Sequence, residues 1–71
     1  MDIKKEIGNK IKQARKSKGY SQKKLAELVG SNQEHISKVE SGKINLTLDY
    51  INKIAGCLGI EINKLFKDNL K

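Results

Sequence analysis

The stretch SQKKLAELVGSNQEHISKVESGK, residues 21–43, decides the fold of this 71-residue chain. It contains two short segments whose apolar residues recur at helical spacing rather than in alternation. The first opens at Ser21, a good N-cap residue, and ends at Gly30. The second opens at Asn32 and ends at Gly42. Two helices this short need tertiary packing to form, and their short glycine-containing connection predicts a helix-turn-helix unit.

The flanking sequence continues the helical pattern on both sides. Upstream, apolar residues at steps of four, four and three from Ile3 to Ala14 predict a first helix that stops near Gly19. Downstream, Thr47 is the expected N-cap of a fourth helix, and a short fifth segment follows. The inward positions expected in these two segments are Leu48, Ile51, Ile54, Ala55, Leu58, Ile62, Leu65 and Phe66. The sequence therefore predicts a single all-α domain of five helices over residues 1–71.

Composition removes several classes of protein. The only cysteine, Cys57, excludes an internal disulfide, and together with the only histidine, His35, it is too little for a Cys/His zinc site. The first 16 residues carry charges every few positions, so they lack the apolar region of a signal peptide. No apolar run approaches the roughly 20 residues of a membrane span. We therefore expect a small cytoplasmic domain without metal, cofactor or membrane insertion.

The positive charge is concentrated in the first third of the chain. Residues 1–24 hold nine basic and two acidic side chains, whereas residues 25–71 hold six of each, so the whole net charge of +7 lies at one end. This asymmetry favours a polyanionic partner, with nucleic acid ahead of a membrane surface. The alternative is a solvated lysine-rich helix that serves solubility alone.

The residues of the central stretch resemble the helix-turn-helix of Cro/C1-type (XRE family) repressors. The matching features are Gln22, Ala26, Gly30, the apolar pair Ile36 and Val39, and the closing Glu40-Ser41-Gly42. The resemblance extends over roughly residues 3–67, and it departs at Ser31, where the family usually has an apolar residue. It implies a compact five-helix lambda-repressor-like domain that binds double-stranded DNA.

The start of the second helix is a candidate phosphate site. Lys23 and Lys24 lie in its first turn, where the helix dipole disfavours cations, so a nearby anion would explain them. The alternative is two exposed lysines with no role. The resemblance places Gln22 against a DNA phosphate through its side chain or backbone N–H. The full set of phosphate contacts expected is Ser21, Gln22, Lys23, Lys24, His35, Lys43 and Asn45.

The third helix is the candidate for base contact. Gln33 lies just inside it, and a glutamine amide pairs with adenine N6 and N7. Glu34 is open to two interpretations, because an acid in a first turn satisfies the helix dipole but also accepts from cytosine N4. The base-contact set expected is Asn32, Gln33, Glu34, Ser37 and Lys38.

Two further features follow from the resemblance. Arg15 and Glu40 occupy positions that form a partly buried ion pair in the family, which is a structural role. The family commonly dimerises through the segment that corresponds to residues 60–71, where the interface candidates are Ile60, Ile62, Phe66 and Leu70. A two-fold dimer would place two recognition helices about 34 Å apart, on successive major grooves. The alternative is a monomer in which these residues only close the core.

These observations favour a sequence-specific transcriptional regulator that acts as a homodimer on a palindromic operator, without a small-molecule ligand. Restriction-modification controllers and phage or mobile-element repressors are relatives of this size. The alternative is an antitoxin-type interaction module that binds DNA only secondarily. A membrane-surface helix is disfavoured because the first helix lacks Trp and Phe, and no arrangement of residues typical of an active site is present.

Overall fold

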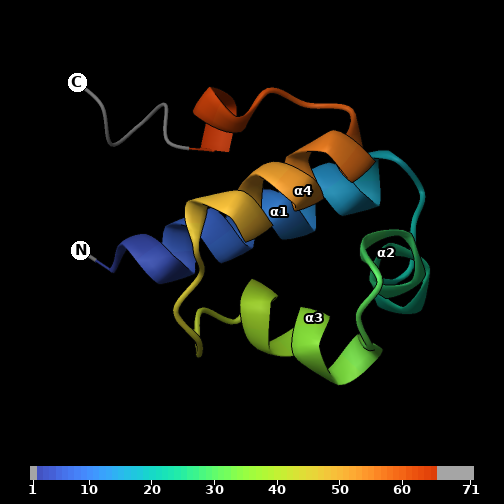
Figure 1. Ribbon diagram of the computed structural model, residues 1–71, viewed down its shortest axis with the longest axis horizontal. Coiled ribbons are helices and arrows are strands. Elements are labelled where there is room, and N and C mark those ends of the chain that lie inside the picture. The colour runs from blue at the N-terminus through green and yellow to red at the C-terminus, as the bar shows by residue number, and fades with distance from the viewer. Residues whose placement is uncertain (1, 66–71) are drawn as a thin grey trace.

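The computed structural model describes residues 2–65, apart from the side chains of Ile62 and Lys64. It contains α1 (Ile3–Ser17), α2 (Gln22–Val29), α3 (Gln33–Glu40) and α4 (Leu48–Leu58), followed by the single-turn 3₁₀ helix η1 (Ile62–Leu65) (Figure 1). No strand occurs between residues 2 and 65. The prediction of an all-helical domain is confirmed, whereas a count of five α-helices is not, because the fifth segment is a 3₁₀ turn as far as it is described.

Three of the four α-helices begin at the caps that the sequence predicts. The side chains of Ser21, Asn32 and Thr47 each accept a hydrogen bond from the backbone N–H three residues on, which satisfies one of the free donors at the helix start. α1 is capped in the same manner by Asp2, whose carboxylate accepts from the N–H of Lys4 at 3.0 Å. Local sequence therefore sets where each of the four α-helices starts.

The four α-helices and η1 pack around one core. α2 packs against α3, α1 contacts both α3 and α4, and η1 closes the side formed by α1 and α4 (Figure 1). The buried core side chains are Ile7, Ile11, Leu25, Ala26, Val29, Ile36, Val39, Ile51, Ile54, Ala55, Leu58 and Leu65. Every α-helix contributes to this core, so α2 and α3 are held by packing rather than by their own helix propensity.

Two apolar residues at helix starts are exposed rather than buried. Leu48, expected to face the core, is 66% exposed, and Ile3 is 46% exposed. Each is the first residue of its helix. Side chains in a helix point back towards its N-terminus, so a side chain in the first position extends past the end of the helix rather than over the core. The expectation for Leu48 is therefore wrong.

Candidate nucleic-acid interface

The turn between α2 and α3 sets the angle between these helices. Gly30 has φ +73°, in the left-handed region that a residue with a Cβ adopts at a cost, and the Ser31 N–H returns to the Ala26 carbonyl at 2.8 Å. Ala26 is 2% exposed, so the small side chain lies in the packed region beneath the turn. α2 and α3 therefore form one rigid helix-turn-helix unit.

α3 is attached to the domain by a narrow face. Ile36 and Val39 are buried, whereas Gln33, Glu34, Ser37 and Lys38 are exposed. Among these exposed residues the structure gives one side-chain contact, a 3.8 Å ion pair between Lys38 Nζ and Glu34 Oε2. Both side chains are more than half exposed, and such pairs contribute little to stability. The outward face of α3 is thus polar and free to contact a ligand.

Asn32 and Ser37 differ from the other base-contact candidates in their surroundings. Asn32 Oδ1 accepts from the His35 N–H at 2.8 Å, so this oxygen serves as the helix cap. Ser37 is exposed but lines a pocket at the junction of α3 with α1 and α2. The structure thus leaves Gln33, Glu34 and Lys38 as the candidates whose side chains extend from α3 into solvent.

The start of α2 presents positive charge beside free backbone donors. Lys23 and Lys24 are exposed in the first turn, and Ser21 Oγ accepts from the Lys24 N–H at 3.0 Å. The earlier N–H groups of a helix have no intrahelical partner, and the helix dipole adds positive potential there. This end of α2 is chemically suited to an anion.

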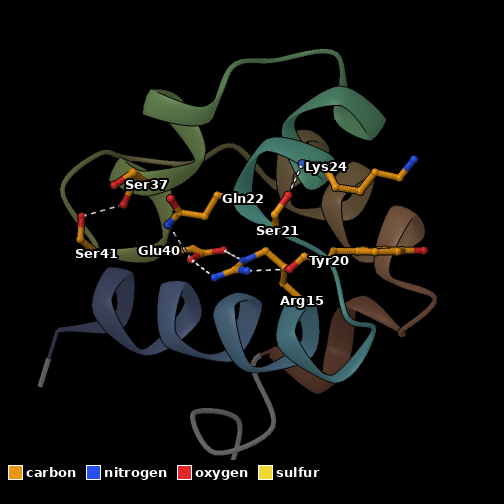
Figure 2. Close-up of polar contacts among 8 residues, drawn as sticks. All are labelled: Arg15, Tyr20, Ser21, Gln22, Lys24, Ser37, Glu40 and Ser41. Carbon is orange, nitrogen blue, oxygen red and sulfur yellow. Dashed lines mark hydrogen bonds and ion pairs between the residues drawn. The ribbon is translucent and has the colours of Figure 1, made fainter.

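A buried polar network connects α1, α2 and α3 (Figure 2). Arg15 Nε and Nη2 donate to Glu40 Oε2 and Oε1 at 2.6 and 3.1 Å, and Arg15 Nη1 donates to the Tyr20 carbonyl at 2.7 Å. The Arg15 and Glu40 side chains are only 8% and 3% exposed. Two parallel hydrogen bonds between a guanidinium and a carboxylate are among the strongest polar contacts in proteins. The pair fixes the end of α3 to α1.

Gln22 belongs to the same network. Its Nε2 donates to Glu40 Oε1 at 3.1 Å, so the side chain that the resemblance assigns to a phosphate is already bound within the protein. A primary amide nitrogen carries two hydrogens, and the second remains available to a ligand. No local sequence pattern predicts this contact, because the two residues are 18 positions apart.

The loop after α3 forms a second candidate contact region. Lys43 and Asn45 are exposed there, and Asn45 lines a pocket of about 240 Å³ with Leu46 and Thr47. His35 and Tyr50 complete the pocket, and their rings pack edge to face with centroids 5.2 Å apart. His35 is half-buried by this contact. Sequence reasoning missed Tyr50, whose hydroxyl is buried with no hydrogen-bond partner among the described residues.

A smaller pocket of about 150 Å³ lies where α1, α2 and α3 meet. Its lining includes Gln22, Ser37 and Glu40 together with Lys12 and Ser41, two residues that were not among the predicted site residues. Lys12 shares one edge of α1 with Lys5 and Lys16, since steps of seven and four return to the same face of a helix. This helical spacing, which can be read from the sequence, could have indicated that Lys12 belongs to a basic face of the first helix.

Neither a metal site nor a membrane-spanning helix is found in the described part of the chain. No three His, Cys, Asp or Glu residues between positions 2 and 65 are grouped so that they could hold a metal ion. None of the helices described here has the length and apolar character needed to cross a membrane. Of the dimer candidates, Ile60 is half-buried against the core, the Ile62 side chain is not described, and Phe66 and Leu70 lie outside the described residues.

Known proteins resemble this chain in sequence and in fold. The control protein C.MunI of a Mycoplasma species is 40% identical over 68 residues, which cover 94% of this chain and 92% of the relative. The crystal structure of the restriction-modification controller protein C.AhdI from Aeromonas hydrophila is 37% identical with a TM-score of 0.82, covering 87% of this chain and 94% of the other.

The biofilm regulator SinR is similar over a shorter share of its length. SinR of Bacillus subtilis is 33% identical over 63 residues, and the match spans 87% of this chain but only 57% of that protein. A crystal structure of SinR in complex with DNA is 34% identical with a TM-score of 0.77, covering 84% of this chain and 97% of the crystallised one. The helix-turn-helix family model HTH_3 matches residues 11–65. With the α2–α3 geometry described above, these matches show that the chain belongs to the helix-turn-helix family of Cro/C1-type proteins.

Proposed function

We propose that this protein is a sequence-specific transcriptional regulator that binds double-stranded DNA through α3 and the start of α2. The observation that carries the proposal is the exposed polar face of α3 together with the two exposed lysines at the start of α2. Ile36 and Val39, on the opposite side of α3, attach the helix to the core. The relatives support it, since they are named as control proteins and regulators and one was solved with DNA. They do not favour an antitoxin-type module.

Within this class, a restriction-modification controller is the reading that the comparisons support best. The match spans nearly the whole length of C.MunI and of C.AhdI, whereas it spans little more than half of SinR. We infer a cytoplasmic homodimer on a palindromic operator, with the 60–71 segment as interface. Two copies related by a two-fold axis would read half-sites about one helical turn apart.

The direct test is selection of bound sequences from a pool of random double-stranded DNA. A regulator of the proposed type enriches a motif with two-fold symmetry and half-sites about 10 base pairs apart, centre to centre. Enrichment of an asymmetric motif would contradict the homodimer, and binding without enrichment would contradict sequence specificity. Sedimentation of the free protein over a range of concentrations checks the dimer independently.

Gln33→Ala is expected to relax base preference at one position in each half-site. The loss of one bidentate amide–adenine contact costs about 1–3 kcal/mol of discrimination at that position. The matched control is Gln13→Ala, which removes the same exposed side chain from α1. Comparison of the selected motifs for the three proteins is the measurement, and a Gln33→Ala motif identical to that of the wild type would remove Gln33 from the base contacts.

Lys23→Gln combined with Lys24→Gln is expected to weaken binding to all DNA sequences alike. Two lost phosphate contacts make the dependence of log K on log salt shallower by about 1.8 per bound protomer. The charge-retaining control is Lys23→Arg with Lys24→Arg, which should keep the wild-type slope. Fluorescence anisotropy over a salt series gives the slopes, and an unchanged slope in the glutamine variant would place both lysines away from the backbone.

A further inference from the structure

The pocket between α3 and the start of α4 carries no fixed charge. Its volume is about 240 Å³, and its lining residues are His35, Asn45, Leu46, Thr47 and Tyr50. They come from α3, from the loop that follows it and from the first turn of α4 (Figure 1). No lysine, arginine, aspartate or glutamate is among them, so this pocket is poorly suited to a phosphate group.

The accessible surface of Tyr50 in this pocket is its ring. The Tyr50 hydroxyl is buried and has no hydrogen-bond partner among the described residues, so it is not offered to a ligand. Packing holds the side chain instead, against the core on one side and edge to face on the His35 ring. Thr47 Oγ1 already accepts from the Tyr50 N–H at 3.1 Å as the cap of α4. With Leu46 as a further wall, the pocket is suited to an apolar group.

The pocket borders the face of α3 that the proposed function assigns to base contact. Successive residues of an α-helix are about 100° apart, so His35 lies roughly 60° around the helix from Lys38 and roughly 40° from Val39. Lys38 is exposed and Val39 is buried, which places His35 at the boundary between the exposed face and the core. A DNA duplex that contacts the exposed face of α3 therefore passes beside this pocket.

The major groove of DNA offers one kind of apolar group to such a pocket. Base edges there present hydrogen-bond donors and acceptors, and the exception is the C5-methyl group of thymine. An apolar cavity of about 150 Å³ holds benzene, so a pocket of about 240 Å³ has room for this methyl group and the adjoining edge of the base.

We propose that this pocket receives the C5-methyl group of one thymine in each half-site, with the rings of His35 and Tyr50 and the Leu46 side chain as its walls. The inference rests on the proposed function and adds a position of base preference to those read by the exposed face of α3. It assigns His35 to a base rather than to a phosphate. Tyr50 has a second role, because its edge-to-face contact fixes the orientation of the His35 ring.

The test starts from a duplex obtained by selection from random DNA and replaces each thymine in turn by deoxyuridine, which lacks only the C5-methyl group. At one position in each half-site, the replacement should weaken binding of the wild type about 4-fold, the loss expected for one buried methyl group. His35→Ala should remove most of this difference at the same position, because it removes one wall of the pocket. Fluorescence anisotropy with the thymine and uracil duplexes gives the affinities.

Two further variants and one control accompany His35→Ala. Leu46→Ala removes a second wall and should reduce the same difference; because Leu46 packs against the core, it is compared well below its melting temperature. Tyr50→Phe keeps the ring and removes only the buried hydroxyl, so the 4-fold difference should persist, and its loss would contradict an apolar contact. Gln13→Ala removes an exposed side chain from α1 and should show the full difference.

The salt dependence separates a methyl contact from a phosphate contact. His35→Ala should keep the wild-type slope of log K against log salt, whereas the loss of one phosphate contact would make the slope shallower by up to about 0.9. If His35→Ala weakens binding to thymine and uracil duplexes equally, the sugar–phosphate chain occupies the pocket and the inference is overturned. It is also overturned, while the proposed function stands, if the wild type selects a motif in which no uracil replacement depends on His35. If the wild type selects no motif, the proposed function itself fails.

Discussion

Glu40→Ala is expected to lower the free energy of unfolding by about 3–5 kcal/mol, because it leaves a buried arginine without its carboxylate partner. Arg15 would lose the acceptor of both its Nε and its Nη2, and Gln22 would lose the acceptor of Nε2. Native proteins are stable by only about 5–15 kcal/mol in total. Urea denaturation followed by circular dichroism is the measurement, and the variant should unfold at much lower urea.

Glu34→Ala is the matched control, because Glu34 forms its 3.8 Å ion pair with Lys38 in solvent. Exposed pairs of this kind are worth less than about 1 kcal/mol. Replacing both members of the buried pair, as Arg15→Met with Glu40→Leu, should cost less than the two single changes added together. A Glu40→Ala protein as stable as Glu34→Ala would show that the network does not hold α3 to α1.

Gly8→Ala is expected to lower the free energy of unfolding by about 3 kcal/mol, despite alanine's higher helix propensity. A Cβ at Gly8 would overlap the Val39 carbonyl oxygen and lie 2.7 Å from the Glu40 carbonyl oxygen. Both atoms are backbone of α3, so relief requires α1 and α3 to move apart. Thermal and urea unfolding measure the loss.

Gly56→Ala provides the control of opposite sign. Gly56 also lies inside a helix, but a Cβ there meets no atom within 4 Å. The substitution should therefore stabilise the protein by about 0.5–1 kcal/mol, the usual gain from replacing a helical glycine. If both alanine variants were stabilised, the close contact between α1 and α3 at Gly8 would be absent in solution.

The sequence was most informative where structure depends on local chemistry. Ser21, Asn32 and Thr47 cap the helices that they were expected to cap, because a short polar side chain satisfies a backbone donor three residues away without any tertiary contact. The prediction for Leu48 failed because helical spacing says which face a residue occupies but not that a first-turn side chain extends beyond the helix end.

In the candidate site, too, the features that depend on local sequence could be predicted, and those that depend on tertiary packing could not. The exposed face of α3 follows from its narrow apolar pair, so Gln33 and Lys38 could be proposed from sequence. The Gln22–Glu40 hydrogen bond and the pocket beside Lys12 depend on how three helices meet, which no local pattern encodes. Gly8 did leave a signal, because a glycine inside a helix costs stability and therefore often marks close packing.

The narrow attachment of α3 has a consequence for how the protein can change over generations. The core holds this helix through Ile36 and Val39, while the side chains of Gln33, Glu34 and Lys38 are exposed. Substitutions at these three positions should therefore leave folding nearly untouched while changing the surface that the proposed function assigns to base contact. Under the proposed function, a duplicated gene copy could change its operator preference in single substitutions, each of which keeps a stable protein.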